Sequence, residues 1–223
     1  MIRVSNITKS YPIQGFARYT VLRDLSLELP SRTPVGIVGR NGAGKSTLLR
    51  LLGGIELPDR GRVEADGRIS PPLGLTSGFA QRISGRDNAR FVSRINGDDR
   101  ATQRERVAYI HAFSELGDFF ERPVETYSSG MRARLAFSIS MSFEFDYYLI
   151  DELTAVGDQK FRAKAQKTFE EKKGRSSVIM VSHNLGQLKR DCTVGVYLRA
   201  GEAVYYDDIE AAIAAYNEDV QHS

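Results

Sequence analysis

Nine consecutive residues have the types and spacing of a loop that wraps the phosphates of a nucleotide. Gly39, Gly42 and Gly44 allow positive φ angles and leave no Cβ between the backbone N–H groups and the phosphate oxygens. Lys45 can reach the β and γ phosphates, and the Ser46 hydroxyl can ligate Mg²⁺. The segment fits the pattern G-x-x-x-x-G-K-[ST] and consists of Gly39, Arg40, Asn41, Gly42, Ala43, Gly44, Lys45, Ser46 and Thr47.

The residues on either side of this loop supply the context that the pattern needs. Val35–Val38 is a short apolar run typical of a buried strand, and Ser46–Leu52 has the pattern of a helix. Such a helix would direct its positive N-terminal end toward the phosphates. A glycine-rich turn that matched by accident would not require a strand before it and a helix after it. We therefore predict that the chain binds a nucleoside triphosphate.

Two adjacent carboxylates follow an apolar strand about a hundred residues later. Asp151 and Glu152 come after Tyr147–Ile150, at the carboxyl end of the strand, where α/β sheets bind ligands. Asp151 can hold Mg²⁺ through water, and Glu152 can accept a proton from an attacking water or orient it. Asp-Glu after a strand is by itself often a polar cap on the next helix. Because a phosphate loop is present, we favour the metal and base roles.

A histidine follows a second apolar strand. Ser182 and His183 come directly after Val178–Val181, again at the carboxyl end of a strand. His183 could hydrogen-bond the γ-phosphate and the attacking water without carrying charge chemistry of its own. Taken alone, it would be interpreted as an ordinary surface histidine.

A third polar segment begins a helix. Ser128, Ser129 and Gly130 precede the helical pattern of Met131–Phe143. Hydroxyls and a glycine at a helix N-terminus can bind an anion. The alternative is an ordinary N-cap with no ligand.

Length and composition indicate one globular domain. The chain has 223 residues, of which 41% are hydrophobic and 26% charged, and its net charge is +3. This charge is too small to indicate nucleic acid as a partner. The single cysteine, Cys192, suits a reducing cytoplasm and is expected to be a small buried residue. The chain lacks a signal segment and an apolar run of 18 residues, so we expect that it neither spans nor crosses a membrane.

Strands and helices alternate along the chain, which predicts an α/β core. A helical insertion is expected between sheet strands from about 84 to 143. Predicted strands are Ile2–Val4, Val21–Leu29, Val35–Val38, Arg62–Ala65, Tyr147–Ile150, Val178–Val181, Val194–Leu198 and Ala203–Tyr206. Predicted helices are Lys45–Leu52, Arg86–Ile95, Arg104–Glu115, Met131–Phe143, Phe161–Lys172 and Ile209–Asn217.

The order of these motifs resembles the nucleotide-binding subunit of ABC transporters over nearly the whole chain. Tyr127–Met131 looks like a variant of the family's Leu-Ser-Gly-Gly-Gln signature, matching its Ser and its second Gly, and Asp158 matches an Asp that meets the partner subunit. The resemblance implies a single domain over 1–223, with a RecA-like P-loop NTPase core, an antiparallel β subdomain and an inserted α-helical subdomain. It also implies a head-to-tail dimer, in which the signature of one copy closes on ATP held by the other. Tyr11 matches the aromatic residue that stacks on adenine.

Several stretches, among them Gly85–Phe91 and Phe145–Asp158, look like the ATPases that export capsular polysaccharide. This resemblance implies an ATPase with ATP and Mg²⁺ as cofactors, peripheral on the cytoplasmic face of the inner membrane. It would drive a polytopic membrane permease through the surface near Ser77–Arg90, and periplasmic and outer-membrane components would be indirect partners. Related O-antigen ATPases carry a long C-terminal domain, and an end at Ser223 favours capsule over O-antigen.

The sequence departs from the family at one functional position. The glutamine that touches Mg²⁺ should follow Phe79, but position 80 is Ala, and Gln81 comes next. Either Gln81 takes this metal-binding role in a shifted loop, or the contact is absent. Alternative functions are the ATPase of an O-antigen, teichoic-acid or drug exporter, a soluble ABC clamp on DNA or the ribosome, and a metabolic kinase. The clamp would need a coiled coil or two fused cassettes, and the kinase would leave the Ser-Ser-Gly helix unexplained.

Overall fold

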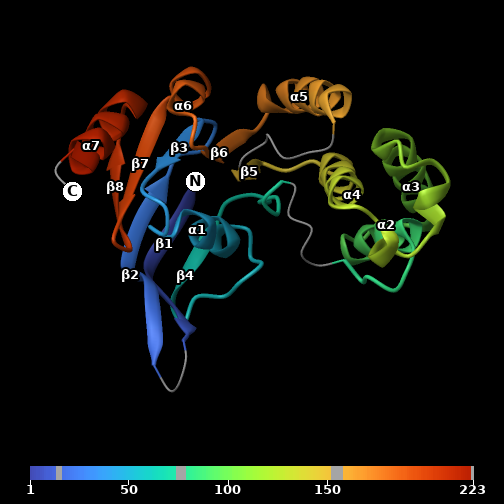
Figure 1. The fold of residues 1–223 in the computed structure, drawn as a ribbon, viewed down its shortest axis with the longest axis horizontal. Coiled ribbons are helices and arrows are strands. Elements are labelled where there is room, and N and C mark those ends of the chain that lie inside the picture. The colour runs from blue at the N-terminus through green and yellow to red at the C-terminus, as the bar shows by residue number, and fades with distance from the viewer. Residues whose placement is uncertain (14–16, 74–78, 152–157, 222–223) are drawn as a thin grey trace. The chain divides into compact units, whose positions relative to one another are not determined.

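The computed structural model describes residues 1–13, 17–73, 79–151 and 158–221 (Figure 1). The chain forms two compact units. The first, called the α/β unit, comprises Met1–Pro72, Phe145–Glu152 and Arg175–Ser223. The second, called the helical unit, comprises Leu73–Glu144 and Leu153–Gly174.

The central sheet of the α/β unit is mostly parallel. Its strand order is β5-β6-β3-β7-β8, and only β8 is antiparallel to its neighbour. The residues of β3, β5 and β6 are nearly all buried, as expected for apolar strands covered on both faces. The strands are β3 Val35–Val38, β5 Tyr147–Asp151, β6 Ser177–Val181, β7 Val194–Arg199 and β8 Glu202–Tyr206.

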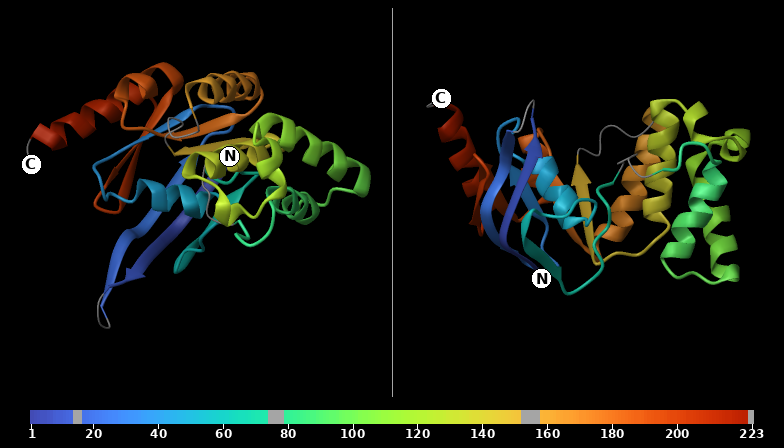
Figure 2. Two further views of the ribbon diagram at one scale, coloured as in Figure 1. Left: turned by 45° about the vertical axis from the view of Figure 1, so that its right-hand side comes forward. Right: turned by 90° about the horizontal axis from the view of Figure 1, so that it is seen from below.

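A second, antiparallel sheet packs with helix α1 against one face of the central sheet. It consists of β1 Ile2–Pro12, β2 Arg18–Leu29 and β4 Arg60–Ala65, in the order β2-β1-β4, and its blue and teal strands lie side by side in Figure 2. Every second residue at the start of β1 is buried, because one face of this sheet covers the core. Leucines of α1, Lys45–Leu52, share that core with Val35 and Ile37 of β3.

Two glycines allow helix α7 to approach the other face closely. Gly36 of β3 and Gly195 of β7 are directly paired across the sheet. A Cβ on Gly195 would lie 2.3 Å from Cβ of Ala212 in α7, which spans Ile209–Gln221. The short helix α6, Leu185–Asp191, is followed by its C-cap residue Cys192, which is buried as predicted.

Four α-helices in the described part of the helical unit begin at side-chain caps. Ser84, Asp99, Ser128 and Asp158 each accept a hydrogen bond from the backbone N–H three residues later. In its core the rings of Phe113 and Phe137 stack, and Phe161 packs edge-on against both. The helices are α2 Gly85–Ile95, α3 Arg100–Ser114, α4 Ser129–Met141 and α5 Gln159–Lys173, with 3₁₀ turns at Gly117–Glu121 and Val124–Thr126.

The predicted α/β fold is confirmed, and the predicted elements differ from the observed ones mainly at their ends. Helix α1 has the predicted bounds. Strand β1 continues to Pro12, far beyond the predicted end at Val4. The sequence does not predict this extension, because register shifts after Val4 break the alternation of buried and exposed residues. Helix α6 was not predicted. In the described ranges, no helix combines the length and apolar character needed to cross a bilayer.

We predict that Gly195→Ala lowers the free energy of unfolding by about 1–3 kcal/mol, the usual cost of overpacking a core. The added methyl group meets a Cβ of α7 that cannot rotate away. Urea unfolding measures the change. The control is Gly174→Ala, at φ −65° with no atom within 4 Å of the new Cβ, and it should stay within about 0.5 kcal/mol of the wild type. Equal losses in the two variants would contradict the packing argument.

Candidate nucleotide site

Three parallel strands bring predicted site residues to one edge of the central sheet. Strands β3, β6 and β5 are neighbours and run in the same direction, so their carboxyl ends lie at the same edge. Ile37 pairs with Val181, and Val181 pairs with Asp151. Because adjacent strands lie about 4.8 Å apart, the backbone of Asp151 is about 10 Å from that of Ile37, just before the phosphate loop.

The phosphate loop has the backbone conformation that its glycines were expected to permit. Gly42 and Gly44 have φ angles of +80° and +103°. A Cβ on Gly39 would lie 2.3 Å from the carbonyl oxygen of Leu198 in β7. Glycine at these positions therefore permits both the left-handed turns and the close approach to the sheet.

The Lys45 side chain lies folded against the loop. Only 7% of Lys45 is exposed, and its ammonium donates hydrogen bonds to the carbonyl oxygens of Gly39 at 2.6 Å and Arg40 at 3.0 Å. The cation is therefore held inside the loop by the backbone. Ser46 is exposed in the first turn of α1, Thr47 is buried, and Arg40 and Asn41 are exposed. A cation, exposed hydroxyl and backbone amides at a helix N-terminus suit a triphosphate with Mg²⁺.

The polar residues after β5 and β6 lie at the same edge. Asp151 is the last residue of β5 and is partly exposed. His183 is exposed and follows Ser182, whose hydroxyl accepts from the backbone N–H of Asn184 at 3.1 Å. The predicted base, Glu152, lies outside the described residues, so its role stays a prediction.

Tyr11, the predicted base-stacking residue, belongs to β1 in the α/β unit. It is half-buried, and its hydroxyl donates to Glu56 at 2.5 Å. Arg50 donates to the same hydroxyl at 3.2 Å. Glu56 and Arg50 belong to no sequence motif, so no pattern of residue types or spacing predicts their contacts with Tyr11.

Ser128, Ser129 and Gly130 lie together at the start of α4 in the helical unit. Ser128 is an N-cap, since its hydroxyl oxygen accepts from the N–H of Met131 at 3.2 Å. Ser128 and Gly130 line a hollow of about 360 Å³ with Asp158, which pairs with Arg134 at 2.5 Å. The pKa of Asp158 is held below its usual range, mainly by the hydrogen bond from the backbone N–H of Phe161 and to a smaller extent by the positive charge of Arg134.

Gln81 belongs to the helical unit, where its side chain is exposed. Its carbonyl oxygen accepts from the N–H of Glu125 at 2.9 Å, which fixes its backbone. The side chain of Asn88 holds the backbone of the preceding residue, Ala80: its Oδ1 accepts from the N–H of Ala80 at 2.9 Å, and its Nδ2 donates to the carbonyl oxygen of Ala80 at 3.0 Å. The predicted metal role of Gln81 remains a prediction.

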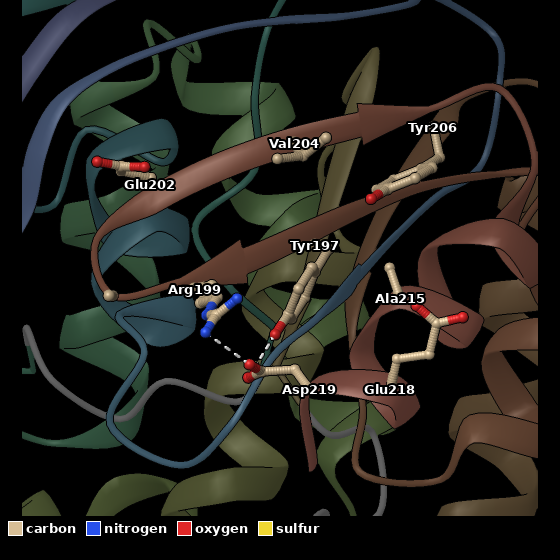
Figure 3. Close-up of a pocket in the computed structure, with 9 residues that line it drawn as sticks. Tyr197, Arg199, Glu202, Val204, Tyr206, Ala215, Glu218 and Asp219 are labelled. Atoms are coloured by element: carbon tan, nitrogen blue, oxygen red, sulfur yellow. Dashed lines mark hydrogen bonds and ion pairs between the residues drawn. The ribbon is translucent and has the colours of Figure 1, made fainter. Parts of the chain in front are cut away.

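A larger hollow of about 720 Å³ lies between the β7–β8 hairpin and α7 (Figure 3). Its lining includes the carboxylates of Glu202, Glu218 and Asp219 and one guanidinium, Arg199. Arg199 and the hydroxyl of Tyr197 both point to Asp219, at 2.8 and 2.7 Å. Burial and this hydrogen bond raise the pKa of Tyr197 to about 12. The excess of negative charge makes this hollow unsuitable for a triphosphate, although it is larger than the hollow beside Ser128.

Comparisons with known proteins agree with the geometry. Residues 22–155 match the ABC transporter family. The chain is 46% identical over 221 residues to the polysialic acid transport ATP-binding protein KpsT of Escherichia coli, covering 99% of this chain and 100% of that protein. It is 42% identical over 217 residues to the capsule polysaccharide export ATP-binding protein CtrD of Neisseria meningitidis serogroup B, covering 97% and 99% of the two chains.

A solved structure shows the same fold. It is described as the dimeric structure of a post-hydrolysis state of the ATP-binding cassette MJ0796 bound to ADP and Pi. The TM-score is 0.75 at 20% identity, with 94% of this chain and 99% of that chain covered.

Proposed function

The chain belongs to the ABC transporter family, and from this premise we propose that it is the ATP-hydrolysing subunit of a capsular polysaccharide exporter. The observation that carries the proposal is the common edge of the central sheet, where the phosphate loop, Asp151 and His183 follow three parallel strands. The names of the two full-length relatives support the substrate. The proposed location is the cytoplasmic face of the inner membrane, as a peripheral protein.

Each residue of the site has a proposed part in ATP hydrolysis. The amides of the phosphate loop and Lys45 bind the triphosphate, and Tyr11 stacks on the adenine. Ser46 and Asp151 would hold Mg²⁺, which neutralises phosphate charge, and Gln81 is the remaining candidate ligand. Glu152 accepts the proton of the attacking water, while His183 hydrogen-bonds the γ-phosphate.

The proposed active form is a head-to-tail dimer of this chain with two ATP molecules. In it, the hydroxyls of Ser128 and Ser129 and the backbone of Gly130 would meet the ATP bound by the other copy. The position of these residues at the N-terminus of α4, where amides and the helix dipole favour an anion, supports this arrangement. The dimeric solved cassette with a similar fold supports it as well.

The proposed membrane partner is a polytopic permease that docks on the helical unit. Helix α2 exposes Phe91 and Ile95, at 57% and 66%. Between α2 and α3 lies a groove of about 530 Å³ lined by four arginines, Arg86, Arg90, Arg94 and Arg104. Such a surface fits a segment of the permease with apolar and acidic side chains. Periplasmic and outer-membrane export components would take part only indirectly.

We predict that Lys45→Ala weakens ATP binding by about 10- to 100-fold, because charge-assisted hydrogen bonds to phosphate are lost. Isothermal titration calorimetry with MgATP measures the dissociation constant. The control is Lys167→Ala, which removes an exposed lysine of α5 and should leave the affinity unchanged. Unchanged affinity in Lys45→Ala would exclude the loop as the nucleotide site.

Glu152→Gln should keep ATP binding and lower the hydrolysis rate by about 100-fold or more, the usual contribution of a general base. With ATP bound but not hydrolysed, the variant should elute as a dimer in size-exclusion chromatography and as a monomer without nucleotide. Rapid turnover by this variant would remove Glu152 from the proposed role.

Replacing the chromosomal gene with the Lys45→Ala variant should leave capsular polysaccharide inside the cell, because export loses its ATPase while synthesis continues. Fractionation of the cells and detection of the polymer inside and on the surface measure this. Restoring the wild-type gene is the control. If the variant cells had a normal capsule but lost surface O-antigen or teichoic acid, the exported polymer would be one of these and not the capsule.

A further inference from the structure

The hydroxyl of Tyr11 is held between two ionised side chains. It donates a hydrogen bond to Oε2 of Glu56 at 2.5 Å and accepts one from the guanidinium of Arg50 at 3.2 Å. Glu56 lies in the connection between α1 and β4, 45 residues away in the sequence. These contacts fix the phenol ring by its polar end.

Arg50 connects this hydroxyl to the helix that follows the phosphate loop. Its Nε donates to Oε1 of Glu56 at 2.6 Å, and Nη2 donates to Oγ1 of Thr47 at 3.2 Å. Thr47 is buried in the first turn of α1 and directly follows Ser46. A chain of hydrogen bonds therefore runs from Tyr11 through Arg50 to the phosphate-binding end of α1.

The ionised state of the pair favours these hydrogen bonds. Burial acts to raise the pKa of Glu56, but hydrogen bonds from Tyr11 and Arg50 outweigh it and hold the pKa below its usual value. Glu56 and Arg50 are 25% and 29% exposed, so water screens their interaction less than that of a surface pair. Lys9 adds a cation 3.5 Å from Glu56 and 5.4 Å from the centre of the Tyr11 ring.

The backbone of β1 is fastened to the same connection. The ammonium of Lys9 donates to the carbonyl oxygen of Leu57 at 2.8 Å, and the N–H of Ser10 donates to Asp59 at 2.7 Å. The N–H of Asp59 donates in turn to the carbonyl oxygen of Thr8 at 2.8 Å. Because the backbone is held independently, losing a side-chain contact to Tyr11 should reorient its ring without unfolding β1.

We propose that Glu56 and Arg50 are positioning residues that fix the Tyr11 ring relative to α1, so that base stacking and phosphate binding occur at a set separation. This proposal rests on the proposed function, which assigns the triphosphate to the phosphate loop and the base to Tyr11. The proposed role of Glu56 involves no contact with the base or with the triphosphate. Glu56 acts through the hydroxyl of Tyr11, and its effect should therefore appear only for ligands that carry a base.

The test compares the dissociation constants of MgATP and magnesium tripolyphosphate, which has the phosphates without the nucleoside, by calorimetry. Glu56→Gln should weaken ATP binding about three- to tenfold, the effect of one hydrogen bond, and leave tripolyphosphate binding unchanged. Tyr11→Leu should weaken ATP binding further, and adding Glu56→Gln to it should cause no additional loss. Tyr11→Phe, which keeps the ring but loses the hydroxyl, should behave like Glu56→Gln.

The matched control is Glu28→Gln, which breaks an exposed ion pair with Arg3 on the same antiparallel sheet. It should change neither dissociation constant. Equal weakening of both ligands by Glu56→Gln, no effect on ATP, or a full additional loss in the Tyr11→Leu background would each overturn the positioning role. Failure of the wild type to bind either ligand would instead refute the proposed function.

Discussion

The parallel pairing of β3 with β6, and of β6 with β5, is the constraint on which the candidate site depends. Each strand is followed by a different polar segment, and only a shared strand direction brings those segments to one edge. Buried apolar residues dominate these strands, which pack on one side against α1 and the antiparallel sheet, and Gly36 of β3 lies against α7 on the other side. The same burial leaves the strand ends as the places where polar chemistry can occur.

Helix α1 connects the two halves of the proposed ATP site. Its N-terminus continues from the phosphate loop, where Lys45 is held on backbone carbonyls. Its last turn supplies Arg50, which contacts the hydroxyl of Tyr11. One rigid helix of eight residues thus fixes the position of the proposed base-binding ring relative to the phosphate-binding amides. Leucines on its buried face hold it against the central sheet, so the core that stabilises the fold also sets the geometry of the site.

The sequence predicted those features that depend on local pattern. Glycine spacing predicts the phosphate loop, and apolar runs predict helix α1 and the ends of β5 and β6. Each of these signals lies within a short stretch of neighbouring residues. The length of β1 did not follow, because its irregular register removes the alternation that identifies a strand. The contacts of Glu56 and Arg50 with Tyr11 join residues 45 and 39 positions apart, and no spacing rule connects them. Asp158 and Ser128 were predicted separately, and only the fold places both beside one hollow.

The cap on α4 bears on the two interpretations of Ser128. Its hydroxyl oxygen accepts from the N–H of Met131, as an ordinary N-cap does. A hydroxyl has one proton to donate and two lone pairs, and capping uses one lone pair. The O–H group remains able to donate to a phosphate oxygen, and the cap fixes the side chain that carries it. The structural and the ligand-binding roles are therefore compatible, and the first orients the hydroxyl for the second.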